Sequence, residues 1–140
     1  MNLVLGRTQL DSIDAILTEH LIGIGAQTSI LIDTAGNIAV VAGNGSGTPD
    51  VYSLAALAAA NFGAMNSMAQ IIGEHEFSLL FHKGQRENIH LSKVNNDFLL
   101  LNIFTNQVSL GFLRLKVTKV IEELLGILEG EVESKSMKGV

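Results

Sequence analysis

Apolar residues recur at intervals of three and four near both ends of the chain, which is the period of an amphipathic helix. Between Thr8 and Ile24, one helical stripe contains Leu10, Ile13, Leu17, Leu21 and Ile24. Gly23 and Gly25 are expected to end this first helix. Near the other end of the chain, Ser109 is expected to cap a last helix whose buried stripe contains Leu110, Leu113, Val117, Ile121, Leu124 and Leu128.

Five shorter runs predict β-strands, because they are rich in β-branched and aromatic residues or alternate apolar with polar positions. Residues 28–33 and 38–42 form one predicted hairpin around a short turn. Residues 76–83 and 86–93 form a second one. Residues 98–104 are apolar at nearly every position, so this strand is expected in the centre of the sheet with layers on both sides.

The order of elements is therefore helix, two strands, helix, three strands, helix. Hairpin connections make neighbouring strands antiparallel, and strands that are apolar on both faces need helices above and below them. The predicted fold is an α/β class, three-layer α/β/α sandwich with a five-stranded antiparallel sheet. A length of 140 residues suits one domain. We place this domain at residues 8–128 and expect residues 129–140 to form a flexible C-terminal tail.

The second helix is expected over Val51 to Gly73, a stretch without any charged side chain. A bilayer span needs about 20 apolar residues, but this stretch is mostly alanine and contains Ser53, Asn61, Asn66, Ser67 and Gln70. Its flanks carry Asp50 and Glu74 instead of the Lys or Arg that would set an orientation. Residues 1–10 have no basic start of a signal peptide. We therefore expect a soluble, cytoplasmic protein.

A helical wheel separates large from small side chains along this second helix. The stripe expected to pack on the sheet contains Leu54, Leu57, Met65, Met68 and Ile72, with Ala58 and Asn61 beside it. The opposite face contains Ala56, Ala59, Ala60, Gly63, Asn66, Ser67 and Gln70. Small, uncharged residues let another backbone approach closely and lower the cost of removing water. Contact with another subunit or a partner is favoured, and the alternative is a helix buried within its own monomer.

Composition and charge exclude several classes of function. Only 16% of residues are charged, against about 25% in an average globular protein. The net charge is −5, and residues 1–82 contain one basic side chain, Arg7, beside seven acidic ones. Binding to nucleic acid needs clustered Lys and Arg to neutralise phosphates, so it is not expected. The absence of cysteine excludes disulfides, thiolate metal sites and a cysteine nucleophile.

One glycine-dense loop, residues 43–50, lies between a predicted strand and the second helix, where a phosphate-binding loop would lie. It lacks the Gly-Lys-Ser/Thr ending of a Walker loop and the glycine spacing of a dinucleotide fingerprint. A mobile loop that ends in a helix cap is therefore favoured over a phosphate site. A small-ligand sensor that uses Gly43 to Gly47 stays open as a third possibility.

No residue pattern supports an enzyme, a metal or a cofactor. His75, His82 and His90 lie close in the sequence to Glu74 and Glu76, but without the helical spacing of metal ligands. The chain also has no Gly-x-Ser-x-Gly nucleophile motif. Structural or surface roles are favoured for these histidines and for the basic residues of the last helix, Arg114, Lys116 and Lys119.

Several short matches, in this order and spacing, make the chain similar to a known family. They are Ser53-Leu54-Ala55, Met65, Ile72-Gly73-Glu74, Glu76-Phe77, Phe81-His82, Gly84, Ser109-Leu110-Gly111 and Arg114-Leu115. Over residues 8–128 the chain resembles the roadblock/dynein light chain family, in particular its bacterial members concerned with gliding and polarity. The resemblance implies a homodimer, or a higher oligomer, that binds a small Ras-like GTPase in its GTP form and accelerates hydrolysis.

The resemblance also implies which residues make these contacts. The GTPase would dock on the small stripe of the second helix, namely Ala56, Ala60, Gly63 and Ser67. Subunits would meet through the long helices and edge to edge through the third strand, with Ala59, Asn66, Gln70, Phe77, Leu79 and Phe81 at the dimer interface.

The distribution of charge adds a statement about mechanism. Many GTPase activators insert an arginine that stabilises charge in the transition state. No Arg or Lys lies between Thr8 and His82, so the second helix cannot supply one. We therefore expect activation by rearrangement of the GTPase's own switch segments. The alternative is a scaffold or adaptor of the same fold that binds a GTPase or motor without changing its cycle.

Overall fold

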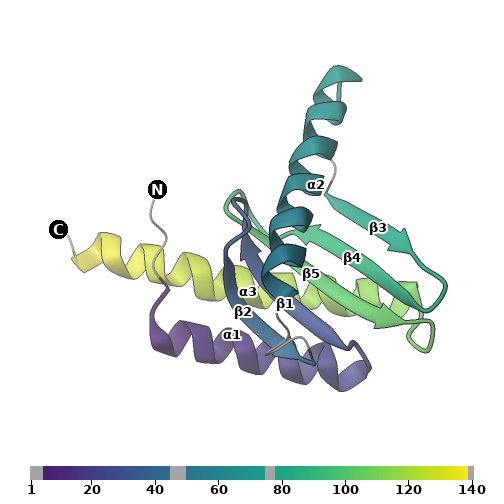
Figure 1. The fold of residues 1–140 in the computed structure, drawn as a ribbon. Coiled ribbons are helices and arrows are strands. Elements are labelled where there is room, and N and C mark those ends of the chain that lie inside the picture. The colour runs from purple at the N-terminus through teal and green to yellow at the C-terminus, as the bar shows by residue number, and fades with distance from the viewer. Residues whose placement is uncertain (1–4, 45–49, 75–77, 139–140) are drawn as a thin grey trace.

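The computed structural model describes residues 5–44, 50–74 and 78–138, with side chains as far as residue 129. It confirms the predicted order of helices and strands (Figure 1). The elements are α1 (Arg7–His20), the 3-10 helix η1 (Ile22–Ile24), β1 (Thr28–Asp33), β2 (Ile38–Gly43), α2 (Val51–Ile71), β3 (Leu79–Lys83), β4 (Glu87–Lys93), β5 (Phe98–Thr105) and α3 (Leu110–Lys138).

The five strands form one antiparallel sheet in the order β2-β1-β5-β4-β3. The apolar strand β5 lies in the centre, as its composition predicts, because its side chains need cover on both faces. Strands β2 and β3 form the two edges. One row across the sheet pairs Ser29 of β1 with Asn102 of β5, and Asn102 with His90 of β4.

Helices cover both faces of the sheet, which confirms the three-layer sandwich. Helices α1 and α3 lie on one face and α2 crosses the other (Figure 1). The core under α1 and α3 includes Ile13, Leu17, Leu31, Leu100, Phe104, Leu113, Val117, Val120 and Leu124. The core under α2 includes Ile30, Ile32, Ala55, Ala58, Phe62, Leu80, Leu91, Leu99 and Leu101. Adjacent residues of one strand alternate between the two cores, as a pleated strand requires.

The turn between β1 and β2 is organised by Asp33. Its Oδ1 atom accepts hydrogen bonds from the backbone N–H groups of Ala35 (3.0 Å) and Asn37 (2.8 Å), which is the geometry of an Asx turn. Gly36 adopts a φ of 93°, and a Cβ at this position would lie 2.9 Å from Cα of Ala56. Glycine therefore allows this turn to approach α2 closely.

The predicted orientation of α2 is partly wrong. Ala58 is buried and Leu54 and Met65 are half-buried, but Asn61 is exposed, and so are Leu57 (68%), Met68 (55%) and Ile72 (68%). The residues that face the sheet are instead Val51, Ala55, Ala58, Ala59 and Phe62. Phe62 is the largest of these side chains and packs into the core under α2. The buried alanines near it let the helix backbone approach the strands closely. The C-terminal part of α2 rises beyond the strands, so its large side chains have no sheet beneath them (Figure 1).

Helix α3 begins as predicted but continues further. The Ser109 hydroxyl oxygen accepts a hydrogen bond of 3.2 Å from the backbone N–H of Phe112, which confirms the N-cap. The helix extends to Lys138, whereas a flexible tail was expected from residue 129. No proline lies within residues 110–138, so none interrupts this helix.

Candidate functional site

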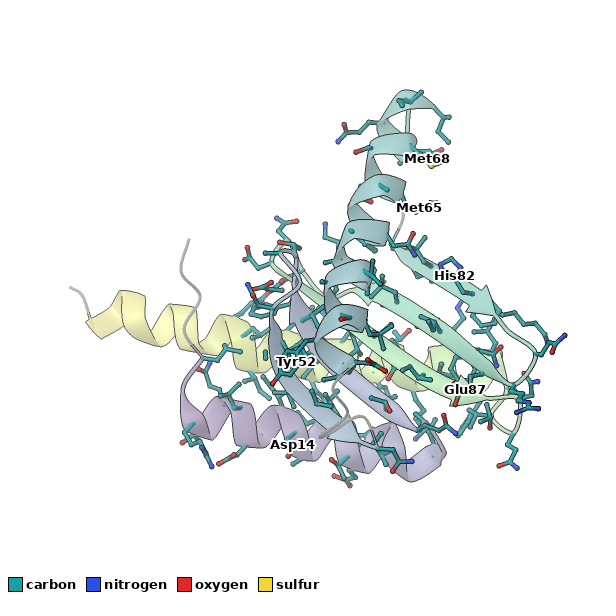
Figure 2. The ribbon with its side chains drawn as sticks, viewed as in Figure 1. Asp14, Tyr52, Met65, Met68, His82 and Glu87 are labelled. Carbon is teal, nitrogen blue, oxygen red and sulfur yellow. The ribbon has the colours of Figure 1, made fainter. Side chains whose placement is uncertain are left out.

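The surface of α2 that faces away from the sheet is the most apolar exposed region of the described residues. Among the described residues, seven large apolar side chains are exposed. Five of these seven belong to α2 or to the residue that follows it. They are Tyr52 (72%), Leu57 (68%), Met68 (55%), Ile71 (84%) and Ile72 (68%). Tyr52 lies near the start of α2 and Met68 near its far end, beyond the strands (Figure 2). A surface of this kind is typical of a protein contact site.

The predicted small stripe runs along the same exposed surface. Ala56, Ala60, Gly63 and Ser67 are all exposed, and the helical period places them opposite the residues that pack on the sheet. A Cβ at Gly63 would meet nothing within 4 Å, so the space above this position is open. The Ser67 hydroxyl donates to the backbone oxygen of Gly63 (3.2 Å), which satisfies the hydroxyl within the helix. We call this stripe together with Tyr52, Leu57, Met68 and Ile71 the outer face of α2.

The outer face of α2 carries no charge. Acidic residues mark its two ends, where Asp50 and Glu74 are exposed, and neither lies within the helix. Covering uncharged side chains removes little bound water, so the desolvation cost of docking here is low. The absence of Lys and Arg also means that this face has no group to stabilise negative charge in a reacting phosphate.

The residues predicted for a dimer interface are placed in different environments. Gln70 is exposed and Asn66 is half-buried, and the buried Oδ1 atom of Asn66 has no hydrogen-bond partner among the described residues. Ala59 is only 7% exposed because it packs on the sheet. On β3, Leu79 and Phe81 are half-buried, and Phe77 lies outside the described residues. The structure thus brings Gln70 and part of Asn66 to the surface of α2, but not Ala59.

Strand β3 and helix α2 are joined by a side-chain contact. The Asn61 Nδ2 atom lies 3.0 Å from Nε2 of His82 (His82 labelled in Figure 2). The Phe81 ring stacks against Phe104 of β5, with ring centroids 6.2 Å apart. Because β3 is also an edge of the sheet, its outer backbone groups are placed where another strand can pair with them.

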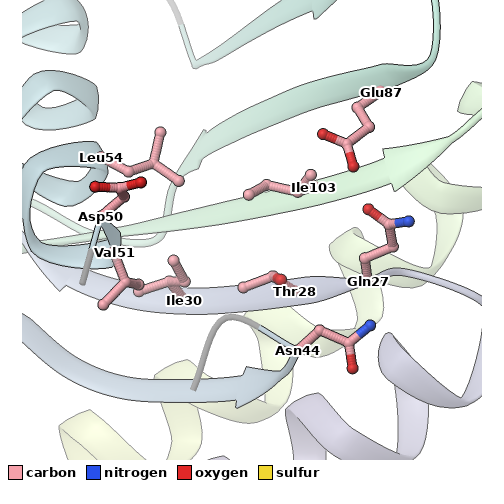
Figure 3. Close-up of a pocket in the computed structure, with 9 residues that line it drawn as sticks. All are labelled: Gln27, Thr28, Ile30, Asn44, Asp50, Val51, Leu54, Glu87 and Ile103. Atoms are coloured by element: carbon pink, nitrogen blue, oxygen red, sulfur yellow. The ribbon is translucent and has the colours of Figure 1, made fainter. Parts of the chain in front are cut away.

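A hollow lies beside the start of α2, between this helix and the strands (Figure 3). It has a volume of about 450 Å³, and Ile30, Leu54 and Ile103 contribute to its apolar part. Asp50 and Glu87 are the charged residues among those described that line it. Two carboxylates without a basic side chain disfavour an anionic group such as phosphate.

The glycine-dense loop follows β2, and its residues 45–49 lie outside the described part of the chain. Gly43 has a φ of 86°, and a Cβ there would clash with the backbone oxygen of Gln27. The fold itself therefore requires this glycine, and its presence gives no support to a ligand-binding role.

The structure also reveals a buried His90–Ser92 pair that the sequence pattern did not single out. The two residues alternate on one face of β4, and His90 Nδ1 lies 3.2 Å from Ser92 Oγ. Burial, and then the positive charge of Arg114, lower the pKa of His90 from 6.5 to about 4. A serine–histidine catalytic unit also needs a carboxylate on the second ring nitrogen, but His90 Nε2 has no hydrogen-bond partner in the described part of the protein.

Metal binding and membrane insertion find no support in the geometry. Within residues 5–44, 50–74 and 78–138, no group of three His, Asp or Glu side chains is arranged to hold a metal ion. No helix of this described part, α2 included, has the length and apolar character that crossing a bilayer requires. His75 and Glu76 lie outside the described residues.

Comparison with known proteins gives a consistent picture. A family model described as the Roadblock/LC7 domain matches residues 24–104. The solved structure of Myxococcus xanthus MglB is 34% identical, with 91% of this chain and 96% of that chain covered and a TM-score of 0.83. The gliding protein MglB from Thermus thermophilus is 27% identical, with 92% and 97% covered and a TM-score of 0.83.

A structure described as MglB with tetrameric arrangement is also 27% identical, with 92% of this chain and 96% of that chain covered and a TM-score of 0.83. The comparison with curated protein sequences found no match. The family model covers more than half of the chain, and the fold agrees with solved members over nearly the whole length. The chain therefore belongs to the Roadblock/LC7 domain family.

Proposed function

We propose that this protein forms a homodimer that binds a small Ras-like GTPase of the gliding and polarity type and accelerates its GTP hydrolysis. The observation that carries the proposal is the outer face of α2, which is exposed, apolar and uncharged on a chain that otherwise covers its core well. Its similarity to MglB, described for one relative as a gliding protein, supports a partner from a gliding system.

The small stripe gives the outer face a shape suited to close contact. Ala56, Ala60 and Gly63 project little beyond the helix backbone, so a segment of the partner can lie directly against the helix. Leu57, Met68 and Ile71 flank this shallow strip and supply apolar area. A central strip bordered by large apolar residues gives both close packing and exclusion of water, which are the features of a stable interface core.

Acceleration of hydrolysis in this proposal does not use an inserted arginine. The outer face of α2 has no basic residue, so its contribution must come from preferential binding of one conformation of the GTPase. A surface that binds the catalytically competent arrangement of the switch segments shifts the population toward it. The catalytic groups then all belong to the GTPase, and the present chain acts as a regulator.

Dimer formation in this proposal uses the edge of the sheet at β3. Pairing of two such edges would satisfy the outer backbone groups of both strands, and Leu79 and Phe81 would lie next to the joint. Gln70 and Asn66 of α2 are the helix residues available to contact the second subunit. Ala59 is omitted from the proposed interface because it already packs on its own sheet.

The test is single-turnover hydrolysis of GTP by a Ras-like GTPase of the same organism, with and without this protein. A rate that rises and saturates with increasing protein supports the proposal. Binding to the GTP form without a change in rate would instead support the alternative, a scaffold or adaptor of the same fold. Absence of both binding and acceleration with every such GTPase would contradict both.

A further inference from the structure

A second cavity lies on the opposite face of the sheet from α2, between β3, β4 and α3. Its volume is about 170 Å³, and Ser78, His90, Ser92, Lys93, Arg114 and Thr118 provide its polar lining. His90 and Ser92 point to the α3 side of β4, because the intervening Leu91 belongs to the core under α2. The cavity is therefore separate from the outer face of α2, and it meets the proposed dimer edge at Leu79 of β3.

His90, which lines this cavity, has a ring nitrogen that forms no hydrogen bond within the described structure. The side chain is 1% exposed, and its Nε2 atom has no hydrogen-bond partner among the described residues. Ser92 lies at the other ring nitrogen, Nδ1. When the Ser92 hydroxyl donates to Nδ1, the neutral ring carries its hydrogen on Nε2. The ring then presents a buried N–H donor that lacks an acceptor, which is an unfavourable arrangement until something accepts from it.

Unpaired polar atoms continue from His90 toward the centre of the sheet. Asn102, the register partner of His90, is fully buried, and both its Oδ1 and its Nδ2 are unpaired within the described structure. The next residue in the same row, Ser29, is also fully buried, and its hydroxyl finds no partner in the part of the chain that the structure describes. A row of three such residues on one face of a sheet is unusual, since buried polar groups are nearly always hydrogen-bonded. This row makes the environment behind His90 polar enough to tolerate a charged ligand.

The charge of the cavity selects the kind of ligand. Arg114 lines it, and none of the described lining residues is acidic. Arg114 and His90 line the same cavity, and the positive charge of Arg114, after burial, lowers the pKa of the His90 ring. A cationic ligand would be repelled here, whereas an anion would be attracted to the guanidinium and could accept from the imidazole N–H. The volume corresponds to a few water molecules of about 30 Å³ each, which is enough for a tetrahedral oxyanion.

We propose that this cavity is a binding site for a small oxyanion of phosphate size, held by the Arg114 guanidinium and the Nε2–H group of His90. Arginine binds such ions through two parallel N–H groups. In this proposal the Ser92 hydroxyl donates to Nδ1, which leaves the ring hydrogen on Nε2. The ion is either free phosphate or the phosphoryl end of a small phosphate ester. Free phosphate and a phosphate ester present the same kind of oxygen atoms to the site. Only the ester requires the cavity to be open toward solvent, so that its organic part can extend outward.

The test compares thermal unfolding of the full chain in phosphate and in chloride at equal ionic strength. Phosphate stabilises most proteins by exclusion from their surface, so the informative quantity is the difference between variants. The variant Arg114→Gln removes the proposed ligand-binding charge, and the matched control Lys119→Gln removes an exposed charge from the same helix that does not line the cavity. At phosphate ten times above Kd, Tm should rise by about 5 °C in the wild type and Lys119→Gln. The rise should fall below half of this in Arg114→Gln.

NMR titration of the His90 ring with inorganic phosphate, and separately with glycerol phosphate, provides the second readout. Saturable shifts with both ligands identify a phosphate ester as an acceptable ligand, and saturation with inorganic phosphate alone identifies the free ion. Equal Tm increases in all three proteins, or shifts that never saturate, would show that the cavity holds only water and overturn the proposal. Gly63→Arg, which disrupts the outer face of α2, should leave these titrations unchanged, so the two proposals fail separately.

Discussion

His90 Nδ1 lies 3.2 Å from Ser92 Oγ in a strand covered by α3, and the imidazole is almost fully buried. Burial and the nearby Arg114 lower the pKa of His90 to about 4 in the folded protein. The unfolded chain, where a histidine has a pKa near 6.5, therefore binds more protons between these two values. The free energy of unfolding should fall as pH decreases from about 6.5 to about 4, by on the order of 3 kcal/mol in total.

Urea unfolding at several pH values between 7 and 4.5 measures this dependence. Carboxylates also begin to titrate at the acidic end, so the contribution of His90 is the difference between the wild type and His90→Gln. The control His82→Gln makes the same substitution at an exposed histidine of the neighbouring strand. An identical slope in His90→Gln would show that another group is responsible.

The observed orientation of α2 predicts unequal costs for two truncations on the same helix. Phe62→Ala removes a ring that is 4% exposed and should lower the free energy of unfolding by about 3–5 kcal/mol, through lost burial and a cavity. Leu57→Ala removes a side chain that is 68% exposed and should change it by about 0.5 kcal/mol or less. Chemical denaturation of both variants measures these changes in the free energy of unfolding. A large decrease for Leu57→Ala together with a small decrease for Phe62→Ala would instead support the orientation predicted from the helical wheel.

Substitution of the small stripe should abolish docking of the GTPase. Gly63→Arg and Ser67→Arg each place a long charged side chain on the outer face of α2, where the space above Gly63 is open, so the fold should be kept. Size-exclusion chromatography with the GTP-loaded GTPase should show loss of co-elution at an unchanged dimer position. Ser12→Arg, on the exposed side of α1, is the matched control and should co-elute normally. Normal co-elution of both stripe variants would place the interface elsewhere.

Removal of the arginine nearest the proposed contact region should have little effect on hydrolysis. Arg7 lies on α1 and Arg114 on α3, both on the face opposite α2, so the remaining arginine, Arg86 between β3 and β4, is the one to test. Arg86→Ala should keep the stimulated single-turnover rate within about tenfold of the wild type. A loss above roughly 100-fold, about 2.7 kcal/mol of barrier, would identify an inserted arginine and contradict activation by population shift.

Much of the fold can be predicted from local pattern because neighbouring residues determine it. Alternation in the strands, the hairpin turn between β1 and β2 and the cap at Ser109 depend on residues close in sequence, and the structure agrees with each. The face of α2 that meets the sheet could not be predicted in the same way. Helical wheels rank residues by size, whereas Ala55 and Ala58 are buried here because small side chains allow close packing on the strands.

In the candidate sites, too, some features can be predicted from the sequence and others depend on how distant elements pack together. Ala56, Ala60, Gly63 and Ser67 are exposed, whereas Ala59, which the helical wheel placed on the same face, is buried. The cavity beside His90 could not be found in the sequence, because Arg114 comes from a helix that is far from β4 along the chain. Alternation does place His90 and Ser92 on one face of their strand, but only the docking of α3 determines which charge comes to lie beside them.

The lack of charge on the outer face of α2 also determines the thermodynamic signature of its complexes. Burial of Tyr52, Leu57, Met68 and Ile71 would give association a negative heat capacity change, since apolar hydration is lost. Because no ion pair is formed at this face, added salt has no attraction to screen there. A contact made through this helix would thus keep its strength across the range of ionic conditions that a cell experiences, and its rate of formation would gain nothing from electrostatic steering.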